Sequence, residues 1–188
     1  MRETFFDAEI VEVIQENPIV RRFKIKMVSL PVFNFTPGQF VQLKLPIQSK
    51  VPYRSYSIAS NPDGSNQFEL IISLKIDGTG THFIWDHFSV GSKIEVSGPH
   101  GKFKLPNVIN KELCFIATGA GIAPLRSMLL HLLENKLSAF PIYLISGNRT
   151  MADNLYHEEM LALEIKYPQF HFIPVLSREN SLAQAFTC

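Results

Sequence analysis

The hydrophobic pattern of this 188-residue chain changes its period close to residue 106. Before that point short segments alternate apolar and polar residues, and after it continuous apolar runs alternate with segments of helical spacing. Alternation is typical of antiparallel strands with one face in water, whereas continuous runs are typical of buried parallel strands. Because the chain is long enough for two small cores, the sequence predicts two domains, at residues 1–106 and 107–188.

The first domain is expected to consist of strands and one short helix. Strands are predicted at residues 8–16, 20–28, 39–45, 53–60, 68–76 and 93–97, and the helix at residues 82–88. Proline and glycine residues separate the strands, and Asn61-Pro62-Asp63-Gly64 is a strong turn signal. Closely spaced strands of this kind favour an antiparallel six-stranded β-barrel.

The second domain has the alternation of an α/β doubly wound parallel sheet. Strands are predicted at residues 113–117, 142–145 and 170–176, and helices at residues 125–137 and 153–166. The apolar run LCFIA at residues 113–117 is expected to be buried on both faces of the sheet. Because residues 181–188 contain no further βα unit, this domain is expected to be incomplete at its C-terminus.

Composition excludes several classes of function. Lys and Arg number 18 against 17 Asp and Glu, a net charge of +1, which argues against nucleic-acid binding through a basic surface. No apolar stretch has the length of a membrane span or a signal peptide. Cys114 and Cys188 cannot supply an iron–sulfur site, and the six histidines lack metal-ligand spacing, so no metal is expected. We expect a cytoplasmic protein.

The sequence Arg54-Ser55-Tyr56-Ser57 ends a predicted strand and combines groups that bind phosphates and rings. Alternation places Arg54 and Tyr56 on one face of the strand, where a fork of charged donors suits a phosphate and a ring suits a planar ligand. A solvated arginine beside a half-buried tyrosine gives the same pattern, and periodicity alone favours that interpretation.

Two glycine-containing turns precede predicted helices. Asp77-Gly78-Thr79-Gly80-Thr81 leads into the helix at residues 82–88, and a threonine-capped N-terminus there offers free amides to an anion. The turn from Thr118 to Pro124 (TGAGIAP) follows a buried strand, where doubly wound folds bind ligands. It lacks the third glycine of the dinucleotide fingerprint, and an ordinary packing turn explains it equally well. For residues 77–81 taken alone, an ordinary capped turn is the favoured interpretation.

The second and third strands of the α/β domain both lead into arginines. The sequence after the second strand is Ser146-Gly147-Asn148-Arg149, and the third is followed by Ser177-Arg178. An acidic residue at such a position would hold the ribose hydroxyl of NAD, whereas arginine suits the 2′-phosphate of NADP. The pattern therefore leans toward NADP, with solvated surface arginines as the alternative.

Taken together, these segments resemble the ferredoxin–NADP reductase superfamily. The matching segments are RSYSIAS (54–60), DGTGTHF (77–83), GPHGKF (98–103), ATGAGIAP (117–124), ISGNR (145–149) and LSRE (176–179). The resemblance implies a barrel that binds a flavin, FAD rather than FMN, and an α/β domain that binds NADPH or NADH. It implies an enzyme that moves a hydride from NAD(P)H to FAD and electrons to a ferredoxin or another acceptor.

The resemblance also assigns residues. Ser57 would lie near the flavin N5 atom and Thr118 beside the nicotinamide, which makes these two the residues at the reacting atoms. The flavin set that it implies is Arg54, Ser55, Tyr56, Ser57, Ile72, Ser73, Leu74, Gly80 and Thr81. The nucleotide set that it implies is Thr118, Gly119, Arg149, Ser177 and Arg178.

One departure from the family leaves a second function open. Members continue into a strand with a Cys-Gly motif, and this sequence has none after Ser177-Arg178, while Cys188 is not followed by glycine. The alternative function is therefore a flavin-binding electron-transfer or interaction module without NAD(P)H turnover.

Overall fold

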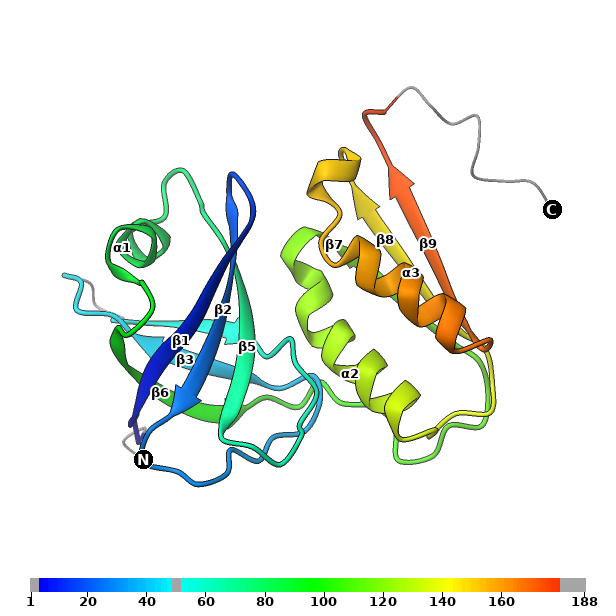
Figure 1. Ribbon diagram of the computed structural model, residues 1–188, viewed down its shortest axis with the longest axis horizontal. Helices are drawn as coiled ribbons and strands as arrows, with labels where there is room; N and C mark the ends of the chain where they lie inside the picture. The colour runs from blue at the N-terminus through cyan, green and yellow to red at the C-terminus, as the bar shows by residue number, and fades with distance from the viewer. Residues whose placement is uncertain (1–3, 49–51, 180–188) are drawn as a thin grey trace. The chain divides into compact units, whose positions relative to one another are not determined.

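The structure, a computed structural model, describes residues 4–48 and 52–179 (Figure 1). The chain forms two compact units. The barrel unit comprises Met1–Val108 together with Ala123–Leu137, and the sheet unit comprises Ile109–Ile122 together with Ser138–Cys188. The helix predicted at residues 125–137, which the sequence places in the second domain, therefore belongs to the barrel unit.

The described part of the barrel unit contains a six-stranded antiparallel sheet of order β4-β3-β6-β1-β2-β5. Its strands are β1 (Phe6–Asn17), β2 (Val20–Met27), β3 (Phe40–Lys44), β4 (Tyr53–Ser57), β5 (Gln67–Ser73) and β6 (Lys93–His100). The prediction of six antiparallel strands is confirmed. The sheet curls like a barrel but does not close, because the outer strands β4 and β5 are joined only by an isolated bridge between Ile58 and Leu70.

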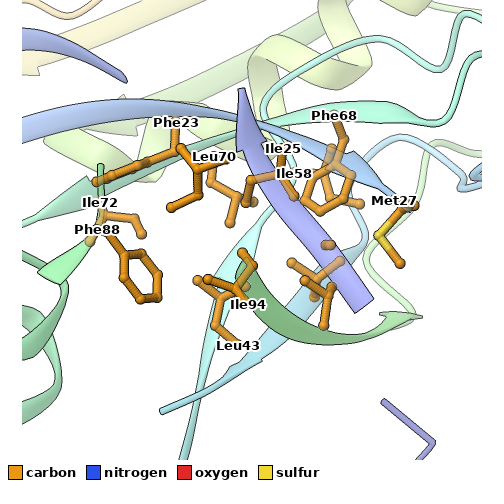
Figure 2. Packing of buried hydrophobic residues seen from close by; sticks show 14 of the residues in the cluster. Phe23, Ile25, Met27, Leu43, Ile58, Phe68, Leu70, Ile72, Phe88 and Ile94 are labelled. Carbon is orange, nitrogen blue, oxygen red and sulfur yellow. The ribbon is translucent and has the colours of Figure 1, made fainter. Parts of the chain in front are cut away.

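Alternation along the strands builds the core of this unit. On β2, Phe23, Ile25 and Met27 are buried, whereas Lys24 and Lys26 between them are exposed. Figure 2 shows these three side chains packed with Ile58, Phe68, Leu70, Ile72 and Ile94 from other segments. A single apolar face of the curled sheet therefore supplies most of this core.

Helix α1 (Thr79–His87) contributes Ile84 to the core, and Phe88, directly after the helix, packs edge-on to Phe23 with centroids 6.3 Å apart. The helix begins three residues before the predicted start. The expected threonine cap is wrong, since Gly78 is the N-cap and makes no side-chain cap hydrogen bond. Instead the Thr81 hydroxyl donates to the Gly78 carbonyl (2.9 Å), so it bonds within the first turn.

The sheet unit contains a parallel sheet of order β7-β8-β9 within the described residues. Its strands are β7 (Leu113–Thr118), β8 (Ile142–Asn148) and β9 (Phe170–Leu176). The predicted parallel α/β arrangement is confirmed for these strands. Residues 181–188, where the sequence predicts an incomplete domain, lie outside the described residues.

Helices of the second half begin and end differently from the sequence pattern. Helix α2 runs over Ile122–Glu134, three residues earlier than predicted at each end, and follows the short helix η1 (Gly119–Gly121). Helix α3 (His157–Lys166) begins four residues later than predicted. A capping box between Thr150 and Asp153 caps the N-terminus of the separate short helix η2 (Met151–Asp153), and Tyr156 then adopts a left-handed conformation (φ 59°) that breaks the helical run.

Strand β7 is not buried on both faces, so that prediction is wrong. Phe115 and Ala117 are buried, but Cys114 is exposed and Ile116 is 70% exposed. The described part of the chain covers only one face of this strand. A continuous apolar run indicates a strand here without indicating how many of its faces are covered.

None of the helices within the described ranges combines the length and the apolar character that crossing a membrane requires.

Candidate functional site

The predicted flavin residues of β4 lie at the edge where the barrel remains open. Arg54 pairs with Leu43 and Tyr56 with Val41 across the β3–β4 ladder, so both side chains project from the core face of the sheet. Leu43 and Val41 are fully buried in the core, whereas Arg54 and Tyr56 are only half-buried. The prediction that Arg54 and Tyr56 share a face agrees with this register.

Strand β5 lies across the opening from these two side chains. An isolated antiparallel bridge joins Ile58, directly after β4, to Leu70 of β5, and the predicted residues Ile72, Ser73 and Leu74 follow Leu70 along the chain. Ile72 is buried in the core, and Ser73 and Leu74 are half-buried. The opening is therefore bordered by β5 on one side and by the strand that carries Arg54 and Tyr56 on the other.

The first turn of α1 closes on Arg54. A Cβ atom at Gly80 would lie 2.9 Å from Nε of Arg54 and 3.2 Å from Cδ1 of Leu45, so only glycine fits without moving them. The first hydrogen bond of the helix runs from the His82 amide to the Gly78 carbonyl (3.0 Å), which leaves the amides of residues 79–81 ahead of it. A guanidinium and the positive end of a helix thus lie together, an arrangement that favours phosphate.

Burial raises the pKa of Tyr56 to about 12, and the charge of Arg54 opposes that rise only in part. The phenol is therefore neutral at physiological pH and keeps its hydroxyl proton. A neutral tyrosine on an open, half-buried face can pack against a ring and donate a hydrogen bond at the same time.

The structure does not bring every predicted flavin residue to one face. Ser55 and Ser57 alternate with Arg54 and Tyr56, so their side chains point to the other face of β4. Ser55 is exposed and Ser57 is half-buried. Ser57 is the last residue of β4, and its side chain lies on the face opposite that of Arg54 and Tyr56.

The predicted nucleotide residues gather at the carboxyl ends of the parallel strands. Thr118 pairs with Gly147, and a Cβ atom at Gly147 would lie 3.3 Å from Cγ2 of Thr118. Gly119 follows with φ +49°, a left-handed conformation that favours glycine. Thr118 and Gly119 are both exposed at this end of the sheet, where open α/β folds bind ligands.

The loops after β8 and β9 are joined by backbone hydrogen bonds. The Ser177 amide donates to the Asn148 carbonyl (3.0 Å), and the Arg178 amide donates to the Arg149 carbonyl (2.9 Å). Arg149, Ser177 and Arg178 are all exposed. Two arginines that are distant in sequence therefore lie on adjacent segments, as a shared anionic ligand requires.

A polar network that the sequence reasoning missed supports this loop. The side-chain oxygen of Asn154 accepts hydrogen bonds from Ser146 Oγ (3.1 Å) and Asn148 Nδ2 (2.9 Å), and Asn154 is only 7% exposed. Its amide nitrogen lies 3.0 Å from Nδ1 of His157. In the sequence, the signal that points to this network is the interruption of an apolar strand by the polar residues Ser146 and Asn148.

A cavity of about 430 Å³ in the barrel unit lies elsewhere. It is lined by residues of α1, β3 and β6, among them Lys44, Phe83, His87 and Glu95. None of the predicted site residues lines it. Across the described ranges, no three histidine, cysteine or acidic residues are grouped so that they could hold a metal ion.

A curled antiparallel sheet with a phosphate-suited edge, followed by a parallel sheet with a glycine turn, is the architecture of flavin- and nicotinamide-dependent oxidoreductases. Sequence comparison agrees with this class. Residues 7–105 match the family described as "Oxidoreductase FAD-binding domain", and residues 115–185 match the "Oxidoreductase NAD-binding domain".

Individual relatives carry names of the same kind. Ferredoxin–NADP reductase B of Sorangium cellulosum is 34% identical over 173 residues, which are 92% of this chain and 70% of the relative. The phenol hydroxylase P5 protein of Acinetobacter pittii is 30% identical over 173 residues, 92% of this chain and 47% of the relative. This chain thus spans 70% of the first relative's length and about half of the second's.

Solved structures match over nearly the whole chain. Amycolatopsis cytochrome P450 reductase GcoB matches with a TM-score of 0.84 at 28% identity, and the match covers 97% of this chain and 55% of that protein's chain. Ferredoxin–NADP⁺ reductase from Plasmodium falciparum has a TM-score of 0.81 at 25% identity, over 94% of this chain and 73% of its own. The chain belongs to the ferredoxin–NADP reductase superfamily of FAD- and NAD(P)-binding oxidoreductases, as its motifs predict.

Proposed function

We propose that this protein is an NAD(P)H-dependent reductase that passes a hydride from NAD(P)H to FAD and then electrons to a ferredoxin or another carrier. The observation that carries the proposal is the seat of Arg54 against the first turn of α1, at the open edge of a family FAD-binding domain. The sheet unit adds a second ligand-binding edge of the kind that binds a dinucleotide.

The residues at the open edge suit FAD. Its pyrophosphate is an anion that the Arg54 guanidinium and the amides of Gly80 and Thr81 would hold, and Gly80 leaves the room that this approach needs. Tyr56 would pack along the flavin, with Ser55, Ser57, Ile72, Ser73 and Leu74 bordering it. Bound FAD would supply the ring that accepts a hydride, so the chain itself needs no acid–base pair there.

The carboxyl edge of the parallel sheet suits the nicotinamide nucleotide. Thr118 and Gly119 would border the nicotinamide, with Thr118 and Ser57 nearest the reacting atoms of the two rings. Arg149, Ser177 and Arg178 would contact the ribose 2′-phosphate, which favours NADPH over NADH. The backbone hydrogen bond between Arg149 and Arg178 supports a shared phosphate ligand.

The acceptor and the division of labour are part of the same proposal. Names such as ferredoxin–NADP reductase, cytochrome P450 reductase and phenol 2-monooxygenase reductase component belong to the relatives, and they support a protein electron carrier or an oxygenase component here. We assign flavin binding to residues 1–106 and nucleotide binding to residues 107–188. The cytoplasmic location expected from the sequence stays a prediction that cell fractionation tests.

An absorption spectrum tests the function directly. The purified chain, loaded with FAD and kept without oxygen, should lose its yellow colour when one equivalent of NADPH is added. Dithionite provides the control, since it reduces any bound flavin. Protein that binds no FAD would overturn the proposal. If dithionite bleaches the bound flavin but neither NADPH nor NADH does, the result would favour the alternative of a flavin-binding module without turnover.

A further inference from the structure

Buried side chains of α2 tie this helix to the barrel unit. Arg126 is 8% exposed, and its Nη1 donates to the Ala59 carbonyl (2.7 Å) and lies 3.1 Å from Oε1 of Glu69. The next residue, Ser127, is fully buried and donates its hydroxyl to the Ser60 carbonyl (2.6 Å). Because an unpartnered buried arginine is strongly destabilising, these acceptors determine where α2 can lie on the barrel.

Backbone hydrogen bonds hold Glu69 in place independently of Arg126. Its amide bonds to Ser60 Oγ (3.1 Å), and its carbonyl accepts from the Ala59 amide (2.8 Å). Its second carboxylate oxygen lies 3.4 Å from Nη1 of Arg22, whose Nε lies 2.6 Å from Glu16. Charges of alternating sign therefore run from β1 and β2 through β5 to α2, and the backbone bonds of Glu69 hold it on β5 independently of Arg22.

A second observation shows that the seat of α2 on the barrel is a built contact. Gly38, on the segment before β3, has φ +95°. A Cβ atom at Gly38 would lie 2.2 Å from Cε of Met128 and equally close to the carbonyl oxygen of Phe103. Glycine at this position therefore lets the segment before β3 approach both the Phe103 backbone and the end of the Met128 side chain of α2.

The anchored segments lie next to the residues of the proposed reaction. Ala59 and Ser60 follow Ser57, the last residue of β4, by two and three positions. At its other end, α2 continues directly from the glycine turn η1, which follows Thr118. One arginine therefore joins the helix that starts at the glycine turn to the end of the strand that carries the proposed flavin contacts.

We propose that Arg126 is a positioning residue for hydride delivery, acting through the placement of α2 on Ala59 and Glu69. The inference rests on the proposed function and deepens it. Hydride transfer is sensitive to shifts of about 1 Å between donor and acceptor, so a loosened α2 slows it. Flavin affinity does not depend on Arg126, because the proposed FAD contacts are on β4, β5 and α1.

The test compares Arg126→Met with Arg22→Met in the FAD-loaded chain. Both variants remove one partner of Glu69, but only the first removes a contact of α2. Stopped-flow absorbance measures flavin reduction by saturating NADPH, and fluorescence measures the Kd for FAD. We expect Arg126→Met to reduce the rate by about tenfold or more, with an FAD Kd within about twofold of the wild type.

Amide hydrogen exchange gives a readout that needs no turnover. Arg126→Met should raise exchange across residues 122–134, while Arg22→Met should leave both that exchange and the reduction rate unchanged. Arg126→Lys, which keeps the charge and loses the planar fork, should restore part of the rate. It also serves as the test variant where the methionine variant does not fold.

The outcomes separate this inference from the function on which it rests. Wild-type flavin that NADPH and NADH leave oxidised would contradict the proposed function, and the exchange comparison then decides whether Arg126 anchors α2. Wild-type flavin that is reduced, with Arg126→Met equally fast or with unchanged exchange in α2, would overturn the inference alone. Equal losses in both methionine variants would assign the effect to Glu69 rather than to α2.

Discussion

Gly80 and Arg54 are in such close contact that no side chain fits between them. A Cβ atom at Gly80 would lie 2.9 Å from Nε and 3.1 Å from Cγ of Arg54. Because the atoms that would have to move belong to a flexible side chain, the conflict changes where the guanidinium points more than how the barrel folds. Gly80 of the DGTGT turn therefore determines the orientation of the Arg54 guanidinium as well as the conformation of the turn.

Replacing Gly80 by alanine should separate binding from stability. Alanine favours a helix over glycine by about 1 kcal/mol, so the free energy of unfolding without FAD should not fall. Forcing Arg54 off its rotamer should raise the Kd for FAD by roughly 2- to 10-fold. Flavin fluorescence titration and urea unfolding measure the two quantities.

The matched control is Asp86→Ala, an exposed position near the end of the same helix. It changes helix propensity without approaching Arg54, so its FAD affinity should equal that of the wild type. If Gly80→Ala bound FAD as tightly as this control does, the Arg54 side chain would not need the space.

Removing the guanidinium itself should have a larger effect. Arg54→Ala should weaken FAD binding by about 1.5–3 kcal/mol, the range of a charged hydrogen bond, or roughly 10- to 150-fold in Kd. Arg54→Lys keeps the charge but lacks the planar fork of donors, so its Kd for FAD should lie between those of the wild type and Arg54→Ala. Equilibrium dialysis against FAD measures all three, and retention of flavin by the alanine variant would refute the assignment.

The sequence predicts the fold well because periodicity is a local property. The alternation of Phe23, Lys24 and Ile25 requires only that one face of a single strand is exposed to solvent. The structure shows this alternation of burial along β2. Coverage by the rest of the chain is not local, and for this reason the pattern could not show that Ile116 is 70% exposed. The threonine cap was mispredicted for a related reason, since Thr81 satisfies Gly78 from inside the helix.

The predicted site residues were found through short motifs, whereas the residues that support them were not. Arg149 and Arg178 stand out in sequence because they follow apolar strands. Arg126 and Asn154 look like ordinary helix and loop residues until their distant acceptors and neighbours are seen. Contacts across a sequence separation of 67 residues, as between Arg126 and Ala59, have no periodic signature.

The raised pKa of Tyr56 predicts a difference at alkaline pH. Since the pKa of Tyr56 is about 12 in the folded chain against its ordinary value of 10.0, the folded state binds this proton more tightly than the unfolded state. The resulting contribution to stability is complete below pH 10 and is lost as the pH rises toward 12. Tyr56→Phe should therefore lose less stability than the wild type over that interval.

Urea unfolding at a series of pH values measures this difference, with the wild type and Tyr56→Phe compared at each pH. The other tyrosines cancel in the comparison because both proteins contain them. Parallel loss of stability in the two proteins from pH 10 to pH 12 would mean that burial does not hold the Tyr56 proton.

Arg178 should discriminate between the two nicotinamide nucleotides. Its amide is bonded to Arg149, and a 2′-phosphate between the two side chains would gain one charged hydrogen bond from it. Arg178→Ala should raise the KM for NADPH by roughly 10- to 100-fold and change that for NADH little. Steady-state rates with both nucleotides measure the ratio, and equal changes would place Arg178 outside the phosphate site.

Asn154 should stabilise the sheet unit through the loop that carries Arg149. Its oxygen accepts from Ser146 and Asn148 at the end of β8, and it is nearly buried. Asn154→Ala leaves two buried or half-buried donors without this acceptor, which costs about 1–3 kcal/mol of unfolding free energy. Urea unfolding measures the loss.

Asn135→Ala is the matched control, because Asn135 is an exposed asparagine whose amide bonds only locally to the His131 carbonyl (2.9 Å) and to the His131 ring. Its change should stay within about 0.5 kcal/mol. Since the network also orients the backbone that leads into Arg149, Asn154→Ala should weaken NADPH binding while FAD binding is retained. A variant as stable as the control, with unchanged nucleotide affinity, would show that the Asn154 hydrogen bonds neither stabilise this loop nor shape the phosphate site.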